Sequence, residues 1–345
     1  MRKSSAALVP ALAALALAAA PRSLAYSWPV KPFEREHPIR GNFGDPRTIF
    51  AYSLNADGLL GPGEFAFHNG VDVAAAPNTP VYPVMSGTVG VKAPGLVAVE
   101  SSDGYAFRYE HLQVAVEAGQ KVIAHQTILG YVEPAAGHVH LSEIRFGEVQ
   151  NPLQPGHLGP FRDHVAPHIV AILARDTSGH DLSPIGLYGS IELVAEVDDD
   201  QPLRVPGIWG GMPVAPSLVA WKMERLKRLR RRLTLVPLTV VADFRRTLPP
   251  NSDFWRIYAR GTYQNMPEIG TKIYYGMPGR FLYKLTPKPL DTRKVRNGVY
   301  LVSVKAVDER HNVRWATTRI SIFNQPARRR VRPLPLPSRP SLPRP

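Results

Sequence analysis

Short β-prone runs alternate with turn residues between Gly70 and about Leu153. The turn positions hold Gly, Pro, Asn or Asp, and no helical spacing of apolar residues is sustained through this half of the chain. Short runs with such punctuation favour an antiparallel sheet. The expected strands are Pro80–Val84, Gly87–Val91, Val97–Glu100 and Tyr105–Tyr109.

Longer β-prone runs follow from about residue 161 to residue 324. In the run near the end, Tyr300, Val302 and Val304 fall on one side of a strand, because strand side chains alternate with a period of two. This pattern predicts a second all-β domain, a sandwich of two sheets. The basic stretch Leu218–Leu233 fits either a short helix or a loop. The expected strands are Ile169–Ala174, Gly189–Val197, Thr234–Val241, Gly298–Val307 and Arg314–Phe323.

The two ends of the chain differ from its middle. Arg2 and Lys3 precede an Ala- and Leu-rich run that ends in small residues at Ala25, so residues 1–25 are predicted to be a signal peptide. This predicts export to a periplasmic, cell-envelope or secreted location. Residues 326–345 are rich in Arg and Pro and are expected to be disordered. Between these ends we expect one domain at 26–158 and another at 159–325.

The composition is basic and lacks cysteine. Lys and Arg number 42 against 28 Asp and Glu, a formal net charge of +14. Such an excess favours anionic partners, here a wall polymer or a membrane surface reached through the basic segments at Lys222–Arg232 and after Arg328, although ordinary solvated charge is an equal alternative. Nucleic acid is not expected, because the basic residues are not interleaved with aromatic residues. Without cysteine, disulfides, thiolate metal sites and cysteine nucleophiles are excluded.

Several histidines lie within the first β region. His68 precedes Asp72 by four residues, His138 and His140 flank one valine, and His111 lies between the two groups. Each spacing alone occurs by chance more often than as a metal site. On a strand, however, His138 and His140 project from one face. Catalytic zinc takes three ligands of the imidazole and carboxylate kind and keeps a fourth position open, so this set suits an open Zn²⁺ site.

These residues lie within a longer series of motifs that resembles the lysostaphin-type (LytM-like) zinc endopeptidases, which cleave peptidoglycan peptides. The resemblance extends from about Arg40 to Pro152, and its landmarks occur in the family's order. They are Asn42-Phe43-Gly44-Asp45-Pro46-Arg47, His68-Asn69-Gly70-Val71-Asp72-Val73, Pro80-Val81, Ser86-Gly87-Thr88-Val89, Tyr109-Glu110-His111-Leu112, Ala118-Gly119-Gln120-Lys121-Val122 and Gly137-His138-Val139-His140-Leu141.

The resemblance implies a role for each matched residue. His68, Asp72 and His140 correspond to the zinc ligands, and His111 and His138 to the two catalytic histidines that do not bind the metal. The expected fold is an antiparallel zinc-peptidase domain followed by an immunoglobulin-like domain, since Asn297-Gly298-Val299-Tyr300 resembles such modules. The implied function is zinc-dependent hydrolysis of peptidoglycan peptides. The main alternative is a non-catalytic relative that binds and activates another cell-wall hydrolase. A weaker one is a secreted metallopeptidase that acts on Gly-rich proteins outside the wall.

The sequence departs from the family pattern after the second histidine of the pair. His140 is followed by Leu141-Ser142-Glu143, one residue more than the family places before its glutamate, which predicts either a β-bulge or a local change in the groove. The remaining histidines do not compose a site and are expected at the surface or in turns. They are His37, His125, His157, His164, His168, His180 and His311.

Overall fold

The structure is a computed structural model that describes residues 25–48, 65–265 and 277–324. The predicted signal peptide, apart from Ala25, and the predicted disordered tail lie outside these residues. Within them the fold is all β, as predicted, and every ladder between named strands is antiparallel. The only α-helix in this part of the chain is α1 (Phe254–Ile257). No helix in the described ranges has the length and apolar character needed to cross a membrane.

The first sheet contains the strands expected between residues 70 and 153. Its central strand β11 (His138–Arg145) lies between β4 (Val71–Ala74) and β8 (Tyr105–Val114). The other members are β1 (Ile39–Gly41), β5 (Pro80–Val81), β6 (Gly87–Ala93), β7 (Gly95–Ser101), β9 (Lys121–Val122), β10 (Gly130–Val132) and β12 (Glu148–Gln150).

Two further sheets form the second half of the molecule. One has the order β14 (Asp181–Leu182), β13 (His168–Arg175), β15 (Ser190–Asp198) and β18 (Leu282–Lys284), with β19 (Leu290–Asp291) also pairing with β15. The other has the order β17 (Arg232–Asp243), β16 (Leu218–Leu226), β20 (Gly298–Val307) and β21 (Val313–Ile322). Residues of both sheets share one hydrophobic core. The immunoglobulin-like topology stays a prediction.

The stretch Leu218–Leu233 is neither the helix nor the loop that its sequence suggested. It contains β16, a short 3₁₀ turn at Arg228–Arg230 and the start of β17. The physical reason is tertiary: Val219, Trp221 and Met223 alternate into the shared core, while the backbone of β16 pairs with a strand on each side.

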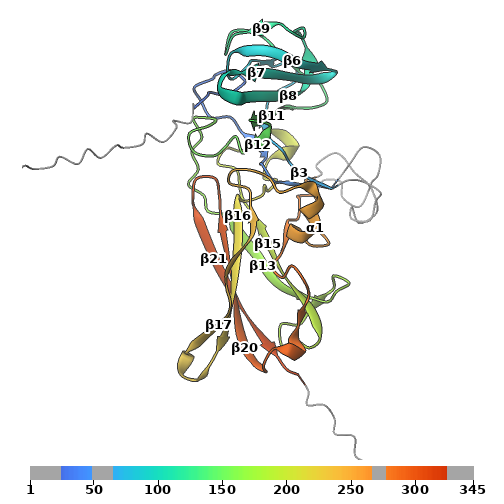
Figure 1. The fold of residues 1–345 in the computed structure, drawn as a ribbon, viewed down its shortest axis with the longest axis vertical. Helices are drawn as coiled ribbons and strands as arrows, with labels where there is room; N and C mark the ends of the chain where they lie inside the picture. The colour runs from blue at the N-terminus through green and yellow to red at the C-terminus, as the bar shows by residue number, and fades with distance from the viewer. Residues whose placement is uncertain (1–24, 49–64, 266–276, 325–345) are drawn as a thin grey trace, which may run out of the picture.

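The two halves contact each other through polar and apolar groups. Figure 1 shows the first sheet at one end of an elongated molecule, with the other two sheets extending away from it. A two-stranded sheet of β2 (Pro46–Arg47) and β3 (Ala66–Phe67) joins them, because Phe67 packs in the core of the second half. Asp45 accepts a hydrogen bond from the Ala215 backbone, and the Tyr258 hydroxyl donates to the Gly44 carbonyl. The limits proposed above, at residues 158 and 325, stay predictions.

Candidate metal centre

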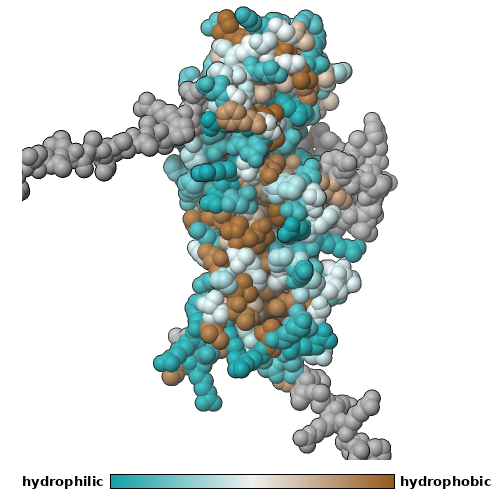
Figure 2. All heavy atoms as spheres, viewed as in Figure 1, coloured by the Kyte–Doolittle hydropathy of each residue, from teal (hydrophilic) through white to brown (hydrophobic). Residues whose placement is uncertain are grey.

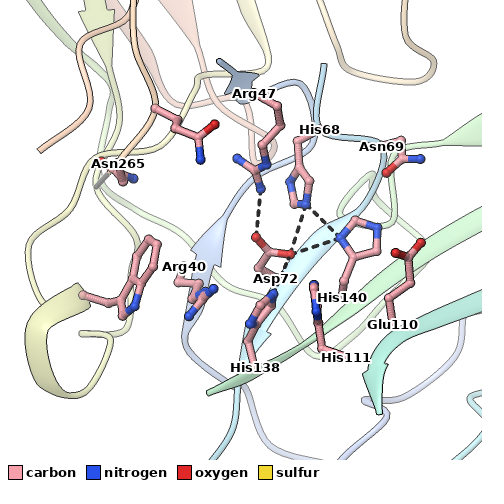
Figure 3. Close-up of a pocket in the computed structure, with 12 residues that line it drawn as sticks. Arg40, Arg47, His68, Asn69, Asp72, Glu110, His111, His138, His140 and Asn265 are labelled. Carbon is pink, nitrogen blue, oxygen red and sulfur yellow. Dashed lines mark hydrogen bonds and ion pairs between the residues drawn. The ribbon is translucent and has the colours of Figure 1, made fainter. Parts of the chain in front are cut away.

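Adjacent strands of the first sheet bring the candidate ligands together. His140 on β11 lies directly opposite Asp72 on β4, and His68 directly follows β3, at the start of the short loop that leads into β4. His138 and His140 both project from the pocket face of β11, as their spacing predicts (Figure 3). His111 reaches the same pocket from β8, the neighbour of β11 on its other side.

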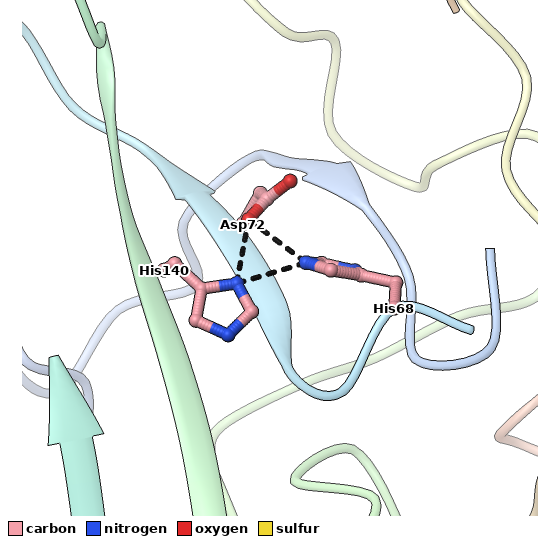
Figure 4. A group of neighbouring side chains, drawn as sticks. All are labelled: His68, Asp72 and His140. Atoms are coloured by element: carbon pink, nitrogen blue, oxygen red, sulfur yellow. Dashed lines mark hydrogen bonds and ion pairs between the residues drawn. The ribbon is translucent and has the colours of Figure 1, made fainter. Parts of the chain in front are cut away.

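Three donor atoms converge at the centre of this pocket. His68 Nε2 lies 3.0 Å from Asp72 Oδ1 and 2.9 Å from His140 Nδ1, and His140 Nδ1 lies 3.1 Å from Asp72 Oδ1 (Figure 4). All three residues are buried. Donors of a tetrahedral zinc ion with bonds of about 2.0–2.1 Å are separated by about 3.3 Å, so a small outward movement would accommodate the metal.

The outer atoms of the same three side chains are held by other groups. His68 Nδ1 lies 2.8 Å from the Asn42 carbonyl oxygen, which only accepts, so Nδ1 donates and Nε2 keeps its lone pair toward the centre. His140 Nε2 lies 2.9 Å from Ser142 Oγ. Arg47 donates to Asp72 Oδ2 at 2.8 Å, which leaves Oδ1 facing the two imidazoles. The arrangement therefore orients one donor atom of each residue inward.

Burial and charge favour the protonation states that a metal needs. Burial, followed by the Arg47 charge, lowers the pKa of His68 to about 3, so its imidazole is neutral at pH 7. Burial alone would raise the pKa of Asp72, but the adjoining histidines and Arg47 outweigh it and hold this pKa well below its usual value. A neutral imidazole and a carboxylate are donors that zinc accepts. The residues present thus fit the metal.

Gly70 permits the close approach of His140. A Cβ at Gly70 would lie 2.4 Å from the Leu141 carbonyl oxygen and 2.7 Å from His140 Nε2. Contacts this short force a shift of backbone or ligand, so only glycine fits between His68 and Asp72 without moving the centre.

His111 and His138 lie beside the three candidate ligands. Their ring centroids are 4.4 Å apart, and His138 Nε2 lies 3.4 Å from Asp72 Oδ1. His138 Nδ1 lies 2.9 Å from the Ala136 carbonyl oxygen, which sets the orientation of its ring. Burial, followed by the nearby His138, lowers the pKa of His111 to about 4, so His111 is neutral at pH 7. The structure thus gathers all five sequence-predicted residues in one pocket.

Of the two expectations after His140, the β-bulge is absent from the ladder between β11 and β8. β11 pairs with β8 from His140 to Arg145 without a register shift. Because the alternation continues, Ser142 stays on the pocket face and contacts His140, while Glu143 turns to the opposite, fully buried face. There the Tyr26 hydroxyl donates to Glu143, and His157 Nδ1 lies 2.8 Å from both carboxylate oxygens. His157 lies in a turn, one of the two positions expected, but it is a buried partner of Glu143 and not a surface residue.

Part of the pocket wall comes from the second half of the molecule. Trp209, Gln264 and Asn265 line the same pocket, and Figure 3 shows Asn265 across it from the histidines. The Arg40 guanidinium lies 4.0 Å from the centroid of the Trp209 ring, which connects the halves at the rim. Sequence reasoning missed Trp209 because its surroundings, Gly207 to Gly211, carry no catalytic pattern. It also gave no role to Arg47, although Arg47 closes the first family motif.

The pocket continues as a groove on both sides. One flank shares Arg40, His111, His138 and Trp209 with the pocket and adds the loop at 133–137. The other flank shares Arg47, His68 and Asn69 and adds residues 147–149 and 247–251. The groove therefore passes along the junction of the two halves, with the candidate metal centre between its flanks.

Comparison with known proteins supports the resemblance over the first sheet. The model of peptidase family M23 matches residues 66–152, a range that contains all five candidate residues named above, four histidines and one aspartate. No curated protein sequence matches the chain.

Several solved structures match part of the chain at low overall similarity. A chain of the SpoIIQ–SpoIIIAH pore-forming complex is 26% identical, with 38% of this chain and 90% of that chain covered and a TM-score of 0.28. A zinc-containing peptidase from Vibrio cholerae is 23% identical, with 37% and 39% covered and a TM-score of 0.29. The catalytic domain of the prophage-encoded M23 protein EnpA from Enterococcus faecalis is 24% identical, with 36% and 93% covered and a TM-score of 0.25.

Proposed function

Starting from the match of residues 66–152 to peptidase family M23, we propose that this protein is a zinc-dependent endopeptidase that hydrolyses peptides of peptidoglycan. The observation that carries the proposal is the convergence of the inward donor atoms of His68, Asp72 and His140 within one groove. A cluster that only stabilised the fold would not need three potential metal-ligand atoms to point at the same place.

In this proposal the three converging residues hold the metal. When bound, zinc supplies Lewis acidity for the scissile carbonyl and lowers the pKa of a coordinated water. Asn42, Ser142 and Arg47 keep His68, His140 and Asp72 in the orientation that leaves one donor atom of each free.

His111 and His138 act on protons beside that centre. One accepts the proton of the attacking water, and the other donates a hydrogen bond to the oxygen that gains charge in the tetrahedral transition state. Both rings border the pocket and neither is needed as a ligand, which supports these roles. We leave open which ring performs which task.

The groove suggests how an extended peptide binds. Its two flanks continue from the pocket in opposite directions along the junction, so a peptide can extend on both sides of the scissile bond. Trp209 and Arg40 form one rim, where they can contact the apolar and the carboxylate groups of a wall peptide. The second half of the molecule thus contributes to substrate positioning.

The proposed substrate requires a compartment outside the cytoplasm. The sequence of residues 1–25 supports export, and a periplasmic, envelope or secreted location would bring the pocket to peptidoglycan.

The test is the metal content of the purified mature protein together with release of cleaved peptides from peptidoglycan, with and without a chelator. One zinc per chain and release that stops with chelator and returns with zinc are expected. Zinc without any cleavage would instead support the regulator that binds and activates another wall hydrolase. Cleavage that is indifferent to chelator would contradict both.

A further inference from the structure

The hairpin between β16 and β17 carries a cluster of unpaired cations at its tip. Leu226 pairs with Arg232, and residues 227–231 form the loop between them, closed by the Lys227 N–H donating to the Arg231 carbonyl at 2.7 Å. Lys227, Arg228 and Arg231 are exposed, and no carboxylate among the described residues lies within ion-pair distance of them. The sequence contains no acidic residue between Arg225 and Ala242. The tip therefore presents positive charge without local compensation.

An apolar side chain stands in the middle of these cations. Leu229 is 90% exposed and has φ of 57°, a left-handed conformation that residues other than glycine rarely adopt. Solvation of the basic loop does not explain why a leucine points outward, since no residue in the described fold covers it. Basic residues that surround an exposed apolar side chain are the combination that binds the interface of an anionic bilayer.

Further apolar side chains lie at the same end of the sheet. The last residue pair of β20 and β21 is Gly298–Ile322, and it lies next to the pair of Leu226 with Val299 at the base of the hairpin. Ile322 also forms a β-bridge with Leu187. Beside these pairs, Ile185 is 78% exposed and Phe323 is 57% exposed. On the other side, Leu233 of β17 is 47% exposed. Apolar groups therefore flank the pairs from which the basic tip projects.

We propose that this end of the molecule docks on the surface of an anionic phospholipid bilayer, with Leu229 inserted among the acyl chains and Lys227, Arg228 and Arg231 among the headgroups. Figure 1 shows the hairpin of β17 at the end of the molecule away from the first sheet. In Figure 2 hydrophilic side chains project from this lower end next to hydrophobic ones. Docking here leaves the first sheet and its pocket clear of the bilayer.

A wall polyanion is the competing partner, and Leu229 separates the two. Both partners would be attracted by the cations, but only a bilayer offers an apolar layer in which a leucine side chain can be buried. The proposal is independent of peptide hydrolysis, because the hairpin tip contributes nothing to the pocket. Hydrolysis of a soluble peptide should therefore be unchanged in all hairpin variants.

The experiment is co-sedimentation of the full mature chain with phosphatidylcholine vesicles, with and without phosphatidylglycerol. Wild type should bind only the anionic vesicles. Replacing Lys227, Arg228 and Arg231 with Ser should weaken binding about 100-fold, since each cation near an anionic surface contributes about fivefold. Leu229→Ser should weaken it about tenfold, because the leucine no longer enters the apolar layer.

The matched control removes the same charge elsewhere. Replacing Lys92, Lys121 and Arg162 with Ser lowers the net charge equally on the first half of the chain and should leave vesicle binding within about twofold. Equal losses in both triple variants would mean that net charge alone attracts the protein, and would overturn the proposal. So would unchanged binding in the hairpin triple variant, or loss in that variant without any loss in Leu229→Ser, which would assign the tip to a soluble polyanion.

Discussion

The two faces of β11 each carry a group of histidine and carboxylate, and the groups differ in how their hydrogen bonds are directed. On the pocket face His140 meets His68 and Asp72. On the opposite face Glu143 meets His157 and the Tyr26 hydroxyl. Both groups are buried, both span distant parts of the sequence, and residue type alone does not distinguish them.

The difference lies in what each group leaves unsatisfied. Donors from Tyr26 and His157 surround the carboxylate of Glu143, so that group is complete without a ligand. At the pocket face, His68 Nδ1 and His140 Nε2 already have hydrogen-bond partners. The atoms that face one another are two imidazole nitrogens and a carboxylate oxygen, and these do not carry enough protons for every pair to form a hydrogen bond. A buried polar group that needs a cation to be complete is a binding site, whereas a saturated one holds the fold together.

His140→Ala should have the largest effect on the pocket group. Removal of one of three ligands should lower zinc affinity more than about 100-fold and abolish detectable hydrolysis. Metal analysis after dialysis and a peptide-release assay measure both effects. Zinc-dependent activity that survives in this variant would disprove the ligand assignment.

His138→Ala should separate binding from turnover on the same face. The variant should keep zinc, because His138 lies outside the converging group, and should lose about 10²–10⁴-fold in turnover. The comparison of zinc content with the turnover number decides it. Loss of zinc in step with activity would make His138 a ligand instead.

Glu143→Ala tests the hydrogen-bonded group of Glu143, Tyr26 and His157 on the face of β11 away from the pocket. It removes the acceptor for Tyr26 and His157 and leaves a cavity, so the free energy of unfolding should fall by about 3 kcal/mol. Zinc content of the folded protein should be unchanged. Urea unfolding provides the measurement, and Glu148→Ala, at an exposed carboxylate on β12, provides the control that should cost little.

Ser142→Ala should have the smallest effect of the four variants. It tests whether the hydrogen bond to His140 orients that residue. Its hydroxyl contacts His140 Nε2 and has no other side-chain partner recorded among the described residues. Zinc affinity should fall about tenfold with stability nearly unchanged, because only the orientation of one ligand is loosened. Zinc titration against a competing chelator measures this. A large loss of stability with normal zinc affinity would place Ser142 among the structural residues.

Much of the pocket was predictable from local pattern. The alternation of strand side chains places His138 and His140 on one face, and the family motifs supply His68, Asp72 and His111 as partners. The same alternation, applied strictly, would also have placed Ser142 on the pocket face and Glu143 in the core. The β-bulge suggested by family spacing is absent because the strand period of two continues through Ser142. The spacing of residues around Glu143 does not indicate that Tyr26 and His157 are its partners.

The sequence was enough to predict most of the strands, the order of the motifs and the chemical type of the candidate ligands, because these depend on residue type and short spacing. Only the tertiary structure decided that Trp209 forms a wall of the pocket, that Leu218–Leu233 becomes a hairpin with a basic tip and that Glu143 is buried with His157. These features arise from contacts between residues far apart in the chain. Their free energy comes from burial and from hydrogen bonds that exist only once the sheets are assembled.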